Sequence, residues 1–195
     1  MVSFSPVFLY FRGGICISIY DILFSLLLAF WIMIPAYLPN SAAAVFGGGR
    51  PIDGGRNWRD GRRMLGDGKT WRGFIGGVMS GIVIGMIQMA AEPYLGLSLL
   101  TPSVVVCLAA GALLGDMVKS FAKRRLNKNR GEEWLIADQY DLVFGAFALL
   151  LIFNYTWVIA TITPLILVWI IILTPLLHRG ANIIGYLIGV KDVPW

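Results

Sequence analysis

Long apolar stretches, separated by two polar and basic loops, make up most of the sequence. Apolar residues dominate five segments, each close to the roughly 20 residues that a helix needs to cross a bilayer. These segments are approximately residues 15–38, 73–92, 102–121, 140–160 and 163–179, and we expect Pro35 and Pro39 to end the first of them. The pattern predicts an all-α, polytopic integral membrane protein in which residues 1–195 form a single transmembrane domain.

The two polar loops cover residues 40–72 and 122–138. Of the 16 Lys and Arg residues, seven lie within 50–72 and six within 119–130. Such concentration of basic residues in short loops is typical of the cytoplasmic side of a membrane protein. We therefore expect both loops in the cytoplasm, and five crossings then put the N-terminus outside and the C-terminus in the cytoplasm. Membrane topology alone would also account for most of these arginines, without any ligand.

The composition argues against several other classes of protein and site. With 57% hydrophobic residues, 14% charged residues and a mean hydropathy of +0.75, the chain is too apolar for a soluble domain. The net charge of +5 comes from residues gathered in the two loops, so it does not indicate a nucleic-acid partner. One histidine and two cysteines in separate apolar stretches argue against a zinc site and against a disulfide framework.

Charged residues near the end of the third apolar segment share one helix face. Asp116, Lys119 and Lys123 are spaced three and four residues apart. An ionised carboxylate costs about 2.5–3.5 kcal/mol at the centre of a membrane helix and less near its end, so Asp116 needs a partner. Lys119 is one candidate. The other is a divalent cation shared with Asp138 or Asp141, and Mg²⁺ suits such oxygen ligands because it also bridges phosphates.

Residues on both sides of the second loop leave two interpretations open. Lys123, Arg124 and Arg125 either bind the phosphates of a nucleotide or anchor the helix to lipid headgroups. Asp138 and Asp141 start the fourth apolar segment, where an aspartate often caps a helix. Because both acidic helix ends border the same loop, we predict that they meet in one site at the membrane surface.

The first loop contains a second candidate for phosphate binding. Gly68, Lys69 and Thr70 match the end of a P-loop, but Arg63 stands where a P-loop has its first glycine. A helix is expected to begin near Trp71, and the N–H groups at a helix N-terminus suit a phosphate. We predict phosphate binding by Lys69 and this helix start, with helix capping and topology as the alternative.

These motifs resemble those of CTP-dependent enzymes that make CDP-activated lipids. The segment GDMVKSFAKR at 115–124, followed by DQYD at 138–141, resembles the CDP-archaeol synthase family, the archaeal relatives of CDP-diacylglycerol synthases. The first-loop segments NS at 40–41, PIDG at 51–54 and LGDGKTWRG at 65–73 also resemble that family. The similarity covers roughly residues 20–180. The bacterial and eukaryotic enzymes carry K-D-x-G and H-G-G-x-x-D-R-x-D motifs in this region, which the present chain lacks.

The resemblance implies a membrane cytidylyltransferase. Its substrates would be CTP and the lipid phosphate 2,3-bis-O-geranylgeranylglycerol 1-phosphate, with Mg²⁺ as cofactor and the CDP-lipid and pyrophosphate as products. It implies a catalytic group of Asp116, Lys119, Asp138 and Asp141, whose three aspartates would be the metal ligands. It implies nucleotide or phosphate contacts at Asn40, Asp53, Gly66, Asp67, Lys69, Thr70, Arg72, Lys123 and Arg124. The site would face the cytoplasm at the cell membrane.

Two rival functions are less consistent with the sequence. A small ion or solute transporter with a cytoplasmic nucleotide- or anion-binding loop would place paired charges near the span centres, whereas these acids cluster at the span ends. A CDP-alcohol phosphotransferase carries Ala-Arg three residues after its first Asp-Gly pair. Here Asp53 and Gly54 are followed at that distance by Asn57 and Trp58.

Overall fold

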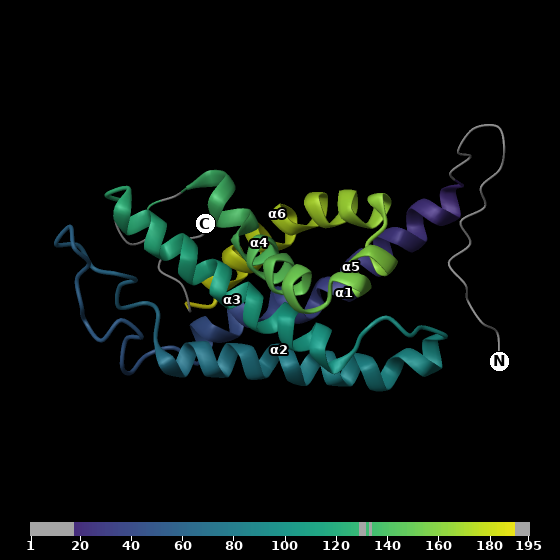
Figure 1. Ribbon diagram of the computed structural model, residues 1–195, viewed down its shortest axis with the longest axis horizontal. Helices are drawn as coiled ribbons and strands as arrows, with labels where there is room; N and C mark the ends of the chain where they lie inside the picture. The colour runs from purple at the N-terminus through teal and green to yellow at the C-terminus, as the bar shows by residue number, and fades with distance from the viewer. Residues whose placement is uncertain (1–17, 129–131, 133, 190–195) are drawn as a thin grey trace.

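The protein is a bundle of membrane-length helices (Figure 1). The computed structural model describes residues 18–128, 132 and 134–189. Five helices in this part of the chain are long and apolar enough to cross a membrane. They are α1 (Ile19–Val45), α2 (Trp71–Ala91), α3 (Pro102–Arg125), α4 (Leu135–Phe153) and α6 (Pro164–Leu187). Two shorter helices, the 3-10 helix η1 (Glu92–Leu95) and α5 (Tyr155–Thr161), lie between them. The predicted all-α membrane architecture is confirmed.

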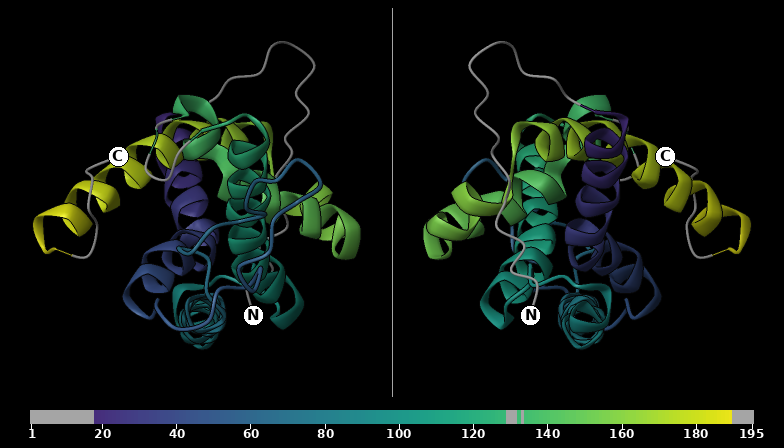
Figure 2. Two further views of the ribbon diagram at one scale, coloured as in Figure 1. Left: turned by 90° about the vertical axis from the view of Figure 1, so that its left-hand side faces the viewer. Right: turned by 90° about the vertical axis from the view of Figure 1, so that its right-hand side faces the viewer.

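Helix α3 is the centre of the bundle. It packs against α1, α2 and α4, while α6 packs against α1 and α4. The views along the bundle in Figure 2 show α2 end-on at one edge and the last turns of α6 extending away from the other helices. Buried apolar side chains fill the space between the helices, among them Ile32, Met33, Leu108, Leu150 and Ile170.

Glycines bring the helix backbones close together. A Cβ atom at Gly81 of α2 would lie 2.7 Å from the carbonyl oxygen of Pro35 and 2.7 Å from Cβ of Ala109. A Cβ atom at Gly111 of α3 would lie 2.6 Å from Cα of Ala146 in α4. These distances are shorter than van der Waals contact, so only glycine permits such packing, as is common between helices in membranes.

The first helix does not end at its prolines, and that prediction is wrong. Pro35 and Pro39 are buried inside α1, which continues to Val45. A proline has no N–H group, so Pro35 leaves the carbonyl oxygen of Trp31 without its helical partner. The side chain of Gln88 in α2 donates a hydrogen bond of 2.9 Å to that oxygen. A partner from a neighbouring helix thus allows α1 to pass through the proline.

The longer helices make both polar loops shorter than predicted. The first loop covers residues 46–70, so Asn40 lies on α1 and not in a loop. The second covers 126–134, because α3 runs to Arg125 and α4 begins at Leu135. The fourth apolar segment also breaks at Asn154, so that the short helix α5 stands between α4 and α6. Residues 15–17 of the first predicted span lie outside the described residues. The orientation of the termini across the membrane stays a prediction.

Candidate active site

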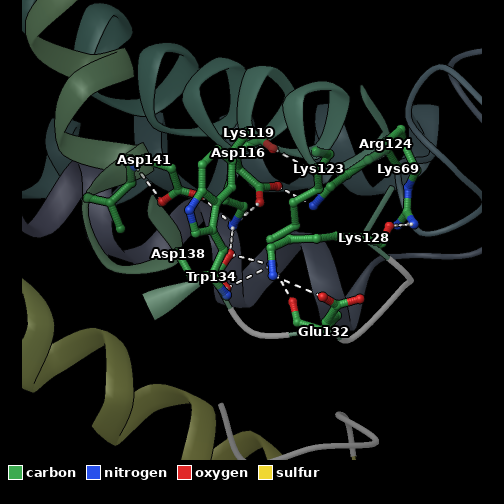
Figure 3. Close-up of polar contacts among 12 residues, drawn as sticks. Lys69, Asp116, Lys119, Lys123, Arg124, Lys128, Glu132, Trp134, Asp138 and Asp141 are labelled. Atoms are coloured by element: carbon green, nitrogen blue, oxygen red, sulfur yellow. Dashed lines mark hydrogen bonds and ion pairs between the residues drawn. The ribbon is translucent and has the colours of Figure 1, made fainter. Parts of the chain in front are cut away.

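Three aspartates from two helices surround one lysine ammonium group (Figure 3). The Nζ atom of Lys119 lies 3.1 Å from Oδ1 of Asp116, 3.3 Å from Oδ1 of Asp138 and 2.6 Å from Oδ2 of Asp141. Lys119 and Asp116 lie one turn apart on α3, whereas Asp138 and Asp141 lie one turn apart on α4. The predicted meeting of the two acidic helix ends is therefore present in the structure.

Two further lysines complete this cluster. Lys69 reaches from the first loop to Oδ2 of Asp116. Lys123, one turn after Lys119, lies 2.7 Å from Asp138 and donates a hydrogen bond of 2.7 Å to the carbonyl oxygen of Glu132. Each carboxylate thus has an ammonium partner, as charges near the end of a membrane span require. Asp116 is thus paired with Lys119, one of the two partners considered for it, and also with Lys69, while a metal ion at this position stays a prediction.

The three aspartates differ in their access to ligands. The side chains of Asp116 and Asp138 are 14% and 22% exposed, whereas that of Asp141 is 2% exposed. Asp141 also accepts a hydrogen bond of 2.6 Å from the backbone N–H of Leu142. In the part of the chain that the structure describes, no three His, Cys, Asp or Glu side chains are grouped to hold a metal ion. The donor chemistry of Asp116 and Asp138, hard carboxylate oxygens open to a cavity, suits Mg²⁺.

Two cavities meet at the cluster. The smaller, of about 270 Å³, is bounded by α1, α2, α3, α4 and α6 as well as by the first loop, and its wall includes apolar Ala43, Phe74 and Leu113. The larger, of about 510 Å³, lies between the first loop and the end of α3. Both cavities share a common wall made by Gly68, Lys69, Asp116, Lys119 and Lys123. Residues that belong only to the larger cavity are mostly basic or polar, including Arg62, Arg63, Asp67, Ser120, Arg124, Asn127 and Lys128.

Asp53 organises the first loop from inside. Its side chain is fully buried, pairs with Arg63 at 2.9 Å, and accepts hydrogen bonds of 3.0 Å from the N–H groups of Gly55, Leu65 and Gly66. Burial alone would raise the pKa of the Asp53 carboxyl, but the guanidinium and the N–H donors outweigh it and hold that pKa well below its ordinary value. Asp53, predicted as a ligand contact, is absent from the lining of both cavities that the described residues form.

The segment that follows Asp53 shapes the wall of the larger cavity. Gly66 has a φ of 99°, a conformation that glycine adopts without strain, and it faces the guanidinium of Arg124. Asp67 lines the cavity and pairs with Arg63 at 2.8 Å. Gly66, Asp67 and Arg124, three of the predicted phosphate contacts, therefore line one cavity.

Three other predicted phosphate contacts do not line the larger cavity that the described residues form: Thr70, Arg72 and Asn40. Helix α2 begins at Trp71 as predicted, and the buried Thr70 caps it by accepting a hydrogen bond of 3.1 Å from the N–H of Gly73. Arg72 is exposed and is absent from both cavity linings among the described residues. Asn40 lines the smaller cavity, where its buried Oδ1 has no hydrogen-bond partner in the described part of the chain. That oxygen is an acceptor suited to a ligand group.

Sequence reasoning missed the contribution of the last helix. His178 and Asn182, one turn apart on α6, line the smaller cavity. A signal was present, because His178 is the chain's one histidine and the two polar residues share a face at the end of an apolar helix. Only the packing of α6 against α1 brings that face to the site.

Comparison with known proteins agrees with the fold and identifies a family. The sequence profile of the CarS-like family, described as CDP-archaeol synthase, matches residues 19–195. A CDP-archaeol synthase of Methanoculleus marisnigri is 62% identical over 166 residues, covering 84% of this chain and 100% of the relative. One of Methanosphaerula palustris is 58% identical over 166 residues with the same coverage. A solved structure of an intramembrane enzyme for archaeal membrane lipids biosynthesis matches with a TM-score of 0.65 and 38% identity, covering 81% of this chain and 94% of that chain.

The matches confirm the resemblance that the loop and helix motifs suggested, and they favour an enzyme over a transporter. The relatives are matched along their full length, and the profile takes in every helix described above. The chain therefore belongs to the CarS-like CDP-archaeol synthase family, a family of membrane enzymes of archaeal lipid biosynthesis.

Proposed function

We propose that this chain transfers the cytidylyl group of CTP to 2,3-bis-O-geranylgeranylglycerol 1-phosphate, forming a CDP-lipid and pyrophosphate. A bond forms between an oxygen of the lipid phosphate and the α-phosphorus of CTP. The bond between the α-phosphorus and the oxygen that bridges to the β-phosphate breaks, and pyrophosphate leaves with that electron pair. The observation that carries the proposal is the meeting of two unlike cavities at one cluster of lysines and aspartates.

The chemistry of the two cavities suggests which substrate each one takes. The larger cavity has basic walls from the first loop and the end of α3, as a nucleotide triphosphate requires. The smaller cavity joins polar groups such as Asn40 to apolar residues of the membrane-length helices. A lipid phosphate would place its headgroup there while its chains stay in the bilayer. This arrangement puts the two reacting phosphates at the shared wall of the cavities.

The lysines of the shared wall would make the main contribution to catalysis. A lipid phosphate is already an anion near neutral pH, so its attack on phosphorus needs no general base. Lys69, Lys119 and Lys123 would hold phosphate oxygens in line and neutralise the charge that develops on the leaving pyrophosphate. Their carboxylate partners fix the three ammonium groups in place before substrate binds.

We assign the Mg²⁺ ligands to Asp116, which opens onto both cavities, and to Asp138, which opens onto the smaller one. Mg²⁺ bound there would supply charge neutralisation at the phosphate oxygens. Asp141, the third ligand expected from the sequence, is buried against Lys119 and would position that lysine. The site would lie on the cytoplasmic side of the cell membrane, where CTP is available and where the basic loops are expected to lie.

Turnover by the purified protein in detergent tests this proposal. CTP, MgCl₂ and the isoprenoid ether-lipid phosphate should give equal amounts of pyrophosphate and CDP-lipid, and chelation of Mg²⁺ should stop the reaction. Asp116→Asn should lower kcat about 100-fold or more, the scale seen when a charge-stabilising group is removed. Asp21→Asn is the matched control, because Asp21 only caps the first turn of α1. Full activity of Asp116→Asn, or turnover without lipid phosphate, would refute the proposal.

A further inference from the structure

The first loop is fastened to the end of α3 by contacts that lie beside the larger cavity. Arg125 forms an ion pair with Asp60, and its Nη2 donates hydrogen bonds to the carbonyl oxygens of Arg63 at 2.6 Å and Arg62 at 3.3 Å. Arg62 donates in return to the carbonyl oxygen of Arg125 at 3.2 Å. Arg125 itself is absent from the lining of both cavities in the described structure.

Aromatic contacts strengthen the same junction between the first loop and the end of α3. The guanidinium carbon of Arg125 lies 4.9 Å from the centroid of the Phe121 ring, which is one turn earlier on α3. Trp58 of the loop packs edge-on against Phe121, with a centroid distance of 5.3 Å and an interplanar angle of 88°. Cation–π and edge-to-face contacts of this kind favour one fixed geometry. Residues 57–63 are therefore held on α3 by charge, hydrogen bonds and ring packing together.

This junction determines where the cavity wall stands. The chain passes directly from Arg63 into the segment 65–69, whose Leu65, Gly66 and Lys69 line the larger cavity. Asp53 fixes this segment to the rest of the loop through the N–H groups of Leu65 and Gly66. Among the described residues, Asp53 contacts only the loop itself, so the loop is joined to α3 at two places: by Lys69, which pairs with Asp116 inside the cavities, and by Arg125 and the ring contacts at the end of the helix.

We propose that Arg125, paired with Asp60, is a positioning residue that fixes the first loop on α3 and thereby sets the affinity of the larger cavity for the nucleotide. Its guanidinium serves the loop and not a phosphate or a lipid headgroup. The proposal rests on the proposed function only in taking CTP as the nucleotide.

Kinetics of three variants test the inference. Arg125→Ala should raise KM for CTP about tenfold, the scale of losing charge-assisted hydrogen bonds, while kcat changes by less than about threefold. Arg125→Lys keeps the charge but not the forked bonds to two carbonyl oxygens, so its KM should be intermediate. Asp60→Asn keeps the side-chain oxygen that accepts from the N–H of Arg62 at 3.1 Å, and should raise KM by removing only the charge. Arg59→Ala, which removes an exposed arginine of the same turn, is the matched control.

A second readout needs no substrate. Chymotrypsin should cut after Trp58 several-fold faster in Arg125→Ala than in the wild type, both purified in detergent, because this substitution leaves the cleaved sequence unchanged. If the wild type fails to use CTP, the proposed function is wrong, and the cleavage rates alone decide on the role of Arg125. Equal effects of Arg125→Ala and Arg59→Ala, or a loss of kcat at constant KM, would overturn the inference. If Arg125→Ala does not fold, Asp60→Asn at its exposed loop position decides.

Discussion

Replacement of Asp141 by asparagine tests whether this carboxylate holds Lys119 or a metal ion. Its side chain is 2% exposed, and Oδ2 lies 2.6 Å from the Lys119 ammonium group. Asparagine has nearly the same shape and keeps an oxygen that can accept from the N–H of Leu142, but it carries no charge. The change therefore removes one of the three ionic contacts of Lys119 and leaves those to Asp116 and Asp138.

The expected loss follows from the type of contact. A hydrogen bond between charged groups contributes about 1.5–3 kcal/mol. If Lys119 depends on this bond to stay in place during catalysis, kcat should fall about 10- to 100-fold, because about 1.4 kcal/mol corresponds to a factor of ten. The Mg²⁺ concentration for half-maximal activity should not change. In Asp138→Asn that concentration should rise, since Asp138 opens onto the cavity.

Pyrophosphate release measured across a Mg²⁺ titration separates the two roles. Gel filtration and thermal unfolding in detergent show whether each variant remains folded, and kcat at saturating Mg²⁺ isolates the effect on catalysis. An increase of the half-maximal Mg²⁺ concentration in Asp141→Asn as large as that in Asp138→Asn would refute our division of the aspartates. Asp141 would then be a metal ligand, as the sequence alone suggested.

Three other changes test separate parts of the structure. Lys69→Ala should raise KM for CTP about tenfold with a smaller effect on kcat, and unchanged kinetics would remove the first loop from the nucleotide site. Asp53→Asn should make stability less dependent on pH in acid. Because folding lowers the pKa of Asp53, its ionised carboxylate stabilises the fold above about pH 4, the pKa of an aspartate in the unfolded chain. This contribution is lost as the pH falls further. A wild-type melting temperature that falls no more steeply below pH 4 than that of the variant would contradict this. Gln88→Leu should destabilise the protein by about 1–3 kcal/mol, because the carbonyl oxygen of Trp31 loses its donor. In a Pro35→Ala background, where the helix supplies that donor, denaturant unfolding should show a smaller decrease in the free energy of unfolding for the same change. Equal decreases in the two backgrounds would show that Gln88 does not donate to this carbonyl oxygen.

The features that the sequence predicted are those fixed by local pattern. Apolar length gave the five spans, and the three- and four-residue spacing gave the shared face of Asp116, Lys119 and Lys123. The start of α2 at Trp71 is also a local feature, since the cap that Thr70 provides lies directly before the apolar run. In each case the information lies within about one helical turn or one membrane thickness of the residue concerned.

The structure differs from the sequence-based picture where a distant residue changes the outcome. No residue near Pro35 indicates that Gln88, far along the chain, will donate the hydrogen bond that the missing N–H group of Pro35 cannot. Asp53 reads as a ligand contact in a glycine-rich loop, but four donors from 55–66 enclose it. Arg125 reads as one of three equal basic residues, yet the rotation of α3 turns it toward the loop while Lys123 faces Asp138. These outcomes depend on tertiary packing, which the local sequence does not encode.

The pairing of lysines with aspartates implies that nucleotide and metal bind together. Lys69 is paired with Asp116, and Lys123 with Asp138. A nucleotide that took Lys69 alone would leave Asp116 with one partner fewer, and a metal that took Asp116 alone would do the same to Lys69. Such partly buried charges cost about 1–3 kcal/mol each when a hydrogen-bonded partner is lost. When the two ligands arrive together, each lysine exchanges a carboxylate for a phosphate and each aspartate exchanges an ammonium for Mg²⁺, so no charge is left unpaired. Calorimetric titration should therefore show CTP binding about tenfold or more weaker without Mg²⁺, and equal affinity in both conditions would show that these pairs stay intact when CTP binds.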